Sequence, residues 1–273
     1  MKGKLLVMGL LATLPLFGAF TTSSESNTPS IVRVERGKYN SEARLKIMSP
    51  PVLKKDSPIL VLVSNFPIGV DVKSQQLNDE GVKENPYGSR VLLMFSNGRR
   101  LYVTKDDVNL LFAQRSYFNK RFRVKVPENI YKDVEQSSFA IYSMLVNSYG
   151  ETIKNENAFF TDVYCYSKEK SDVKQMKENL KKPFLVYNEP FGVIEGGNVL
   201  LDFYLRNVEL SKTGYTVDLI VDDHKITKIT KWTPNVIKNL KKGVHTIKLE
   251  LIDPSGKVLN NPASVNSATI HIK

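Results

Sequence analysis

Cysteine is nearly absent from this chain, which has one, Cys165, among 273 residues. A single thiol cannot form an intramolecular disulfide, so the fold has to be stabilised by buried surface even in an oxidising compartment. Cys165 lies in an expected strand from Ala158 to Tyr166 and has no histidine near it in the sequence. We therefore expect a small buried hydrophobic residue and not a reactive thiol.

Histidine is almost as scarce, with three residues in all, His224, His245 and His271. No pair of them has the spacing of metal ligands, and the sequence motifs of nucleophilic serines, zinc proteases and phosphate-binding glycine loops are missing. A metal site at Asp222, Asp223 and His224 competes with a simpler interpretation, because Asp-rich turns form local hydrogen bonds without any ion. The sequence thus predicts no catalytic residues, no metal and no cofactor, and we expect a protein that is not an enzyme.

Long hydrophobic runs are missing after the N-terminus. Lys2 and Lys4 precede an apolar run from Leu5 to Phe20, and Thr and Ser residues follow it, which is the order of a secretory signal peptide over residues 1–20. The run is shorter than the roughly 20 apolar residues that a membrane-spanning helix requires, so we expect no transmembrane segment in the mature chain. The expected location is periplasmic or secreted, with association with the cell surface as a further option.

Negative charge is in deficit. The chain has 39 Lys and Arg residues against 28 Asp and Glu residues, a formal net charge of +11. An excess of this size bears on partners and not on the fold. Two interpretations stay open: a Lys-rich composition spread over a solvated surface, or a face that docks on anionic lipid, glycan or nucleic acid.

Alternation of apolar and polar residues at period two is, by contrast, abundant. It is clearest in two runs, Val199 to Leu205 and Tyr215 to Val221, which are separated by a turn at residues 212–214. This pattern predicts a β-hairpin with one face in a core. On the first strand of the hairpin, Asp202 and Tyr204 fall on the opposite, polar face.

The first half of the chain has strand signals of the same kind. Asn97-Gly98 separates an apolar run from Val91 to Phe95 from a second run, Leu101 to Thr104, and predicts a hairpin because both turn residues tolerate positive φ. Residues 67–88 show little pattern and are predicted to form a long loop, of the kind that is functional or mobile.

These strands predict an all-β fold of two tandem Ig-like β-sandwich domains that are joined by a short helical linker and preceded by the signal peptide. The predicted boundaries are residues 21–38 for a flexible tether, 39–166 for the first sandwich, 167–182 for the charged helical linker and 183–273 for the second sandwich. Within the tether, Ile31 to Val34 is a candidate for a first strand.

One expected strand has a cationic outer face, since basic and apolar residues alternate along it. The anion-binding hypothesis includes Arg121, Arg123 and Lys125, together with Arg99 and Arg100. Two aromatic residues nearby, Tyr117 and Phe118, are the candidates for stacking on bases or sugars. The alternative is an ordinary edge strand that charge protects from aggregation.

Several segments of the chain are similar to a family of exported bacterial proteins of undetermined function. They are GSRVLLMFSNG and NSYGETIK in the first half, and LLDFYLRNVELSKTGYTV, the Lys231-Trp232 pair with Pro234, and GVHTIKLELIDPSGKV in the second. The resemblance implies tandem Ig-like domains. Family members often carry His-x-His where this chain has Arg90 and Leu92, and a histidine where it has Gly150, so the resemblance implies a fold and no chemistry.

The function expected from the sequence is that of a non-enzymatic, exported cell-envelope module that binds a protein, a glycan or an anionic surface. The alternative is an envelope accessory protein that binds a metal, or that binds an anionic polymer such as a glycan or lipid head groups through the basic strand face. No specific recognition of nucleic acid is expected.

Overall fold

The fold is described for residues 28–35, 42–71, 74–107, 119–166 and 172–273 of a computed structural model. The predicted signal peptide, residues 1–20, and the aromatic candidates Tyr117 and Phe118 lie outside these ranges.

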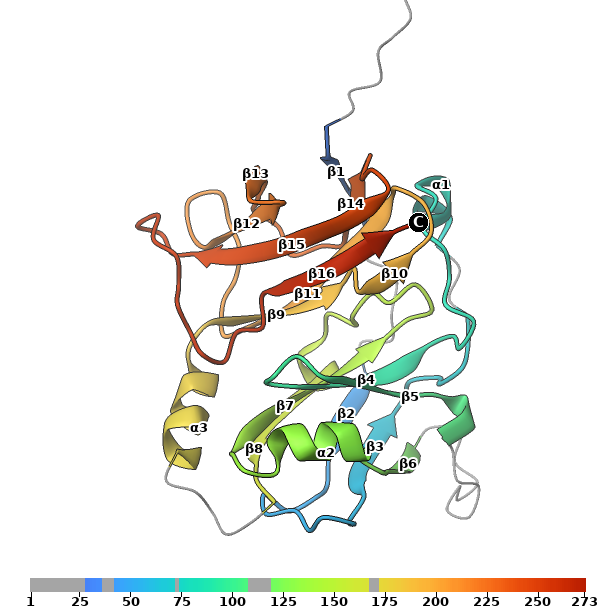
Figure 1. The fold of residues 1–273 in the computed structure, drawn as a ribbon, viewed down its shortest axis with the longest axis vertical. Coiled ribbons are helices and arrows are strands. Elements are labelled where there is room, and N and C mark those ends of the chain that lie inside the picture. Colours follow the sequence, from blue (N-terminus) through green and yellow to red (C-terminus); the bar gives the residue numbers. More distant parts are fainter. Residues whose placement is uncertain (1–27, 36–41, 72–73, 108–118, 167–171) are drawn as a thin grey trace, which may run out of the picture.

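In the ranges given above, seven strands form the first sandwich, in two antiparallel sheets that lie in the lower half of Figure 1. The first outer sheet contains, in spatial order, β2 (Arg44–Ile47), β3 (Ile59–Ser64) and β6 (Asn119–Val124). The first inner sheet contains β5 (Arg100–Val103), β4 (Arg90–Phe95), β7 (Phe139–Val146) and β8 (Phe159–Tyr164). The predicted Asn97-Gly98 hairpin is confirmed, because β4 pairs with β5.

Nine of the strands that the structure describes form the second sandwich. The second inner sheet contains β1 (Ser30–Arg33), β14 (Asn235–Lys238), β11 (Val199–Arg206) and β9 (Phe184–Glu189). The second outer sheet contains β10 (Gly192–Ile194), β16 (Ser267–Ile272), β15 (Gly243–Ile252), β12 (Thr216–Val221) and β13 (His224–Ile229).

Both sandwiches have the same Ig-like topology. In the first sandwich the chain leaves β2 and crosses to the other sheet, where Val52 pairs in parallel with Cys165. In the second it leaves β9 and crosses to the other sheet, where β10 pairs in parallel with β16. The fold is therefore all-β and consists of tandem Ig-like sandwiches, as the sequence predicted.

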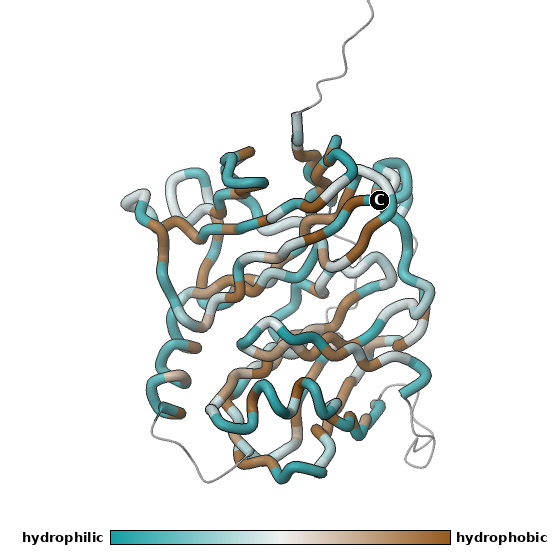
Figure 2. The backbone as a smooth tube through the Cα atoms, viewed as in Figure 1, coloured by the Kyte–Doolittle hydropathy of each residue, from teal (hydrophilic) through white to brown (hydrophobic). Residues whose placement is uncertain are grey.

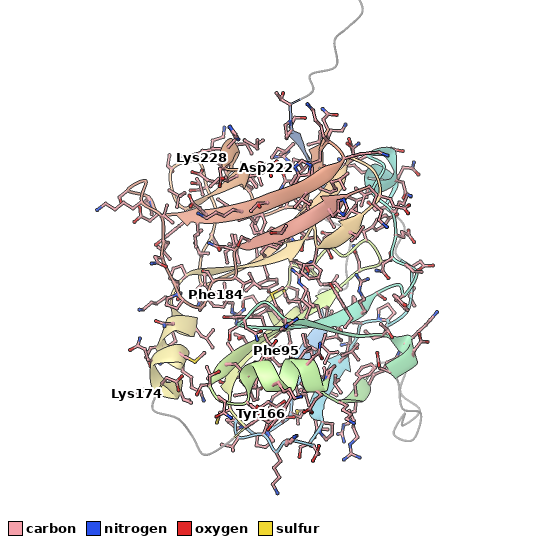
Figure 3. All side chains as sticks on the ribbon, in the orientation of Figure 1. Phe95, Tyr166, Lys174, Phe184, Asp222 and Lys228 are labelled. Atoms are coloured by element: carbon pink, nitrogen blue, oxygen red, sulfur yellow. The ribbon has the colours of Figure 1, made fainter. Side chains whose placement is uncertain are left out.

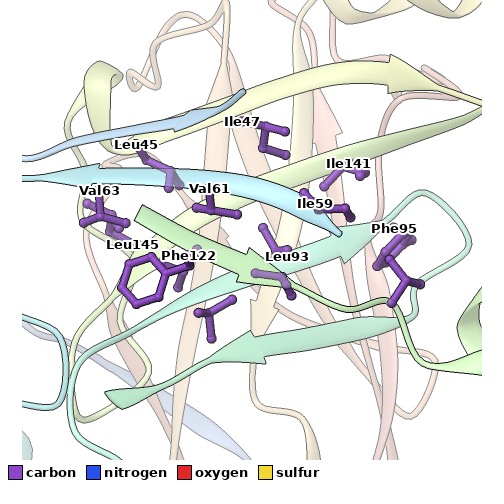
Figure 4. Packing of buried hydrophobic residues seen from close by; sticks show 14 of the residues in the cluster. Leu45, Ile47, Ile59, Val61, Val63, Leu93, Phe95, Phe122, Ile141 and Leu145 are labelled. Carbon is purple, nitrogen blue, oxygen red and sulfur yellow. The ribbon is translucent and has the colours of Figure 1, made fainter. Parts of the chain in front are cut away.

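Each core lies between the two sheets of a sandwich. In the first sandwich, alternate residues of the outer sheet, such as Leu45, Val61 and Phe122, face Leu93 and Leu145 of the inner sheet (Figure 4). Full burial of one such side chain contributes roughly 1.5–3 kcal/mol to the free energy of unfolding. In Figure 2 the hydrophobic residues run along the strands, and hydrophilic residues prevail in the turns at the periphery.

The predicted hairpin of residues 199–221 is wrong in its pairing. Both strands form, but β11 pairs with β9 and β14, and β12 pairs with β13 and β15 of the other sheet. The nine residues between them cross from one sheet to the other. Period-two patterning shows that a strand has an apolar face, but two strands with inward apolar faces fit equally well in one sheet or in two facing sheets.

The flexible tether predicted over residues 21–38 does not hold for Ser30–Arg33. These four residues are strand β1, which pairs antiparallel with β14 at the edge of the second inner sheet. The candidate strand at Ile31 to Val34 is thus present, and it extends the second sandwich although it precedes the first in the chain.

The two inner sheets lie face to face, so the four sheets form one stack (Figure 1). Leu92 of β4 and Met144 of β7 pack against Phe184 of β9 and Tyr204 of β11. All six residues of β4 and all eight of β7 are buried, because these strands are covered on both faces. The face of β11 predicted to be polar is therefore buried and not in contact with solvent. Asp202 and Tyr204, which lie on it, are each 1% exposed.

Among the described residues, three helices pack around this stack: α1 (Gln75–Asp79), α2 (Glu128–Val134) and α3 (Val173–Lys181), with 3-10 turns η1 (Lys105–Asp107) and η3 (Glu156–Ala158). Helix α1 lies in the predicted long loop, and its Leu77 packs against Leu200 and Val236 of the second sandwich. Helix α3 lies in the predicted linker, and its Met176 and Leu180 pack against the hydrophobic residues that fill the space between the inner sheets.

Candidate functional site

A buried ion pair joins the two sandwiches. Lys154, in the β7–β8 connection, contacts Asp202 of β11, and the two side chains are 2% and 0% exposed. The second carboxylate oxygen of Asp202 accepts hydrogen bonds from the backbone N–H of Thr152 and from Asn188 Nδ2, both at 3.0 Å. The sequence missed this cluster, although an aspartate inside the apolar run Leu200–Leu205 was its signal.

A pocket of about 660 Å³ opens beside this cluster, where the edge of the first inner sheet meets the β9–β10 connection. It is lined chiefly by residues 81–87 and by residues between 189 and 200, with Arg90 and Tyr102 at the first sandwich. Both sandwiches thus contribute walls. We call it the junction pocket.

Arg90 and Glu189 are the charged groups at the inner wall of the junction pocket. Arg90 is 4% exposed, and its Nη1 donates to the carbonyl of Gly88 at 3.0 Å while the guanidinium lies 5.0 Å from the centroid of the Tyr102 ring. Burial lowers the pKa of Arg90. Burial also raises the pKa of the Glu189 carboxyl to about 7, against the opposing pull of the guanidinium groups of Arg100 and Arg90.

Gly150 is required for the close approach of Glu189. Its φ is 94°, and a Cβ at this position would lie 3.1 Å from Cγ and Oε1 of Glu189. The neighbouring Asn188 donates from Nδ2 to the Gly150 carbonyl, which fixes the loop against β9. A larger residue at position 150 would displace the Glu189 side chain.

Replacing Glu189 by glutamine is expected to change the pH dependence of stability. The carboxyl has an ordinary pKa of 4.5 and a folded-state pKa of about 7, so between these values the folded protein binds more protons than the unfolded chain, and wild-type stability falls as pH rises. Relative to Glu189→Gln, the wild type should lose about 2–3 kcal/mol between pH 5 and pH 8. Urea unfolding of both proteins at the two pH values measures this, and a pH-independent difference would contradict it.

The predicted basic face lies on the first outer sheet, at the far end of the stack from the second sandwich. Arg121 and Arg123 on one side of β6, and Lys125 directly after it, are exposed, as the sequence predicted. The structure adds two exposed residues that the sequence did not assign to it, Arg44 and Lys46 of β2.

The other two arginines of the anion-binding hypothesis do not join this face. Arg99 forms an ion pair with Asp133 of α2 at 2.5 Å. Arg100, on the first inner sheet, donates from Nη2 to the Tyr187 carbonyl at 3.3 Å and lies 4.0 Å from the centroid of the Phe191 ring. Arg100 therefore belongs to the contact between the sandwiches.

Asp222, in the turn after β12, interacts with His245 of β15. Asp222 contacts Nδ1 of His245 at 2.7 Å and accepts from the Thr246 backbone at 2.9 Å. Burial acts to lower the pKa of His245, but the hydrogen bond to Asp222, the hydrogen bond to the Lys241 carbonyl and the charge of Asp222 together outweigh it, so the pKa is raised. Within the described ranges, no group of three or more His, Cys, Asp and Glu residues is placed to hold a metal ion. Figure 3 shows Asp222 in the upper part of the molecule, on the second sandwich.

Trp232 lies where the two sandwiches meet. Its Nε1 donates to the Phe203 carbonyl at 2.9 Å, and its ring meets Tyr204 edge-on at 4.9 Å between centroids. It therefore packs beside the contact between the sheets.

In the described part of the chain, no helix has the length and apolar content to cross a membrane.

No protein-family model and no curated protein matches the chain. Solved structures give distant similarities. Fibronectin(III)-like modules of Clostridium thermocellum CbhA have 14% identity and a TM-score of 0.27, over 33% of this chain and 96% of that chain. A two-domain fibronectin type-III segment of chicken tenascin has 8% identity and a TM-score of 0.21, over 84% and 98%.

A third similar structure is the Bacteroides ovatus protein SGBP-B, in complex with a mixed-linkage heptasaccharide. It has 9% identity and a TM-score of 0.23, over 90% of this chain and 60% of that chain. The TM-scores of all three similarities are low, so the Ig-like fold is established by the strand order of this chain's own sheets.

Proposed function

We propose that this protein is a non-enzymatic, exported binding module that holds an anionic polymer on its first outer sheet. The observation that supports this most directly is the charge of that sheet. Its strands β2, β3 and β6 contain no Asp or Glu, and four cations stand on its solvent face: Arg44, Lys46, Arg121 and Arg123.

The register places these cations in two lines. Lys46 of β2 and Arg121 of β6 both lie opposite Leu62 of β3, and Arg123 lies opposite Leu60. Strands in a sheet are about 4.8 Å apart, so the two lines are separated by roughly 10 Å with an apolar strip between them.

A linear anionic glycan suits this arrangement better than a lipid surface. A sugar ring lying along β3 would rest on the strip formed by Leu60, which is 36% exposed, and Leu62. Its sulfate or carboxylate groups would then reach the cations on either side, and binding would release counterions from the polymer. Export of the protein is supported by the leader-like sequence of residues 1–20.

Neutralising the basic face is expected to weaken binding to heparin and to reduce its salt dependence. Arg121→Gln/Arg123→Gln should elute from heparin at lower salt, and the slope of log K against log salt should fall by about one for each cation removed. Equilibrium titration with heparin between 50 and 300 mM NaCl measures both effects.

Lys241→Gln/Lys242→Gln is the matched control, since it removes the same charge from exposed residues of the second sandwich. If both double variants weaken heparin binding equally, the binding follows net charge and the proposed face is not the site. Vesicles of anionic phospholipid provide the comparison with a lipid surface: stronger binding to them than to heparin would overturn the choice of a glycan.

A further inference from the structure

The junction pocket has an apolar rim that packing does not explain. Among the described residues nine large hydrophobic side chains are exposed, and three of them line this one pocket: Tyr87, Phe191 and Val193, at 50%, 45% and 60% exposure. Two of the three are aromatic and come from different sandwiches. Apolar side chains that gather at the edge of a concave site are typical of ligand binding.

Contacts within the protein hold the Phe191 side of the rim in place. Phe191 follows Pro190 in the β9–β10 connection, and the guanidinium of Arg100 covers one face of its ring at 4.0 Å. Across the pocket, Lys83 and Glu195 join the two sandwiches by an exposed ion pair at 3.0 Å. A preorganised site loses less conformational entropy when it binds.

The charged groups of the pocket are of both signs. Arg90 and Lys83 are cationic, whereas Glu84, Glu189 and Glu195 carry carboxyl groups. An anion would meet the carboxylates and a cation would meet the guanidinium, so a strongly charged ligand of either sign is disfavoured. An uncharged ligand with hydroxyl groups would find donors and acceptors side by side.

We propose that the junction pocket binds one end or a short stretch of an uncharged saccharide. The apolar face of a sugar ring would stack on Tyr87 or Phe191, and its hydroxyls would hydrogen-bond to Arg90 and Glu189. The volume of about 660 Å³ lies within the range of roughly 300–1,000 Å³ for small-molecule sites. This site is separate from the basic face and does not depend on the function proposed for it.

A glycan array of uncharged oligosaccharides, probed at 0.5 M NaCl, tests the proposal. The salt suppresses binding to the basic face. We expect binding to at least one glycan, and titration with that glycan should show a loss of about tenfold or more in Tyr87→Ala and in Phe191→Ala. Val193→Ala should weaken binding by a smaller factor.

Val258→Ala is the matched control for Val193→Ala, because Val258 is also exposed, at 53%, but does not line the pocket. If Phe191→Ala does not fold, Tyr87→Ala still tests the proposal, because Tyr87 lies on an exposed loop and its loss should not disturb the fold. The proposal is overturned if no uncharged oligosaccharide binds, or if Tyr87→Ala binds as the wild type does. It is also overturned if Arg121→Gln/Arg123→Gln abolishes the binding, which would place the saccharide on the basic face.

Discussion

Replacing Asp202 by alanine is expected to lower the free energy of unfolding by about 3–5 kcal/mol. The substitution leaves the Lys154 ammonium, 2% exposed, without its carboxylate in the contact between the sandwiches. It also removes the acceptor of the Thr152 backbone N–H and one of the two acceptors of Asn188 Nδ2, which still donates to the Gly150 carbonyl. The Lys154 ammonium keeps its hydrogen bonds to Thr152, but its buried charge is no longer compensated and the Thr152 N–H loses its acceptor, so the cost is large.

Lys154→Met should lower the free energy of unfolding by a similar amount, because it leaves the buried Asp202 carboxylate without its cation. The double variant Lys154→Met/Asp202→Leu should be markedly more stable than the sum of the single changes predicts, because buried ion pairs are often replaced by apolar residues at little cost. Urea unfolding of the four proteins gives this double-mutant cycle.

The exposed pair Lys83–Glu195 is the control for that cycle. Both of its side chains are 73% exposed, so removing the pair should change stability by less than about 1 kcal/mol. An effect of Asp202→Ala no larger than that of the exposed pair would show that Asp202 and Lys154 are hydrated, and that the inner sheets do not enclose them.

Phe184→Ala is expected to lower the free energy of unfolding by about 3–5 kcal/mol. Phe184 is fully buried, and its ring lies 5.9 Å from that of Tyr142 and 6.4 Å from that of Phe159, both in the first sandwich. In Figure 3 its label lies between the two sandwiches. The substitution therefore empties a space between the inner sheets and leaves the cores inside the sandwiches intact.

The same variant should also weaken the coupling between the sandwiches. Trp232 is the only tryptophan and belongs to the second half of the chain, so its fluorescence reports locally, while circular dichroism reports on both sandwiches. In the wild type the two signals should change together as urea rises, and in Phe184→Ala they should separate.

Phe122→Ala is the comparison for Phe184→Ala, because Phe122 is equally buried, at 1% exposure, but inside the first core. Phe122→Ala should lower the free energy of unfolding by a similar amount, but it should do so by destabilising the first sandwich itself. If Phe184→Ala costs less than about 1 kcal/mol, the ring is solvated and the stacked arrangement of the sheets is wrong.

The sequence alone determined the strands and the residues that face each core. Leu201, Phe203 and Leu249 are buried as their alternation predicted, since a side-chain period of two admits only one apolar face. It also placed Arg121 and Arg123 on an exposed face.

Only the tertiary structure decided what covers the second face of each strand. A polar side chain on that face, such as Asp202, is compatible with water or with a buried partner, and the partner Lys154 lies 48 residues away. For the same reason the sequence did not indicate that β11 and β12 belong to different sheets, that β1 completes the second sandwich, or that Tyr87 and Phe191 meet at one pocket. Such contacts depend on how two sheets stack, which is decided by the fit of whole surfaces and not by the local pattern of any one strand.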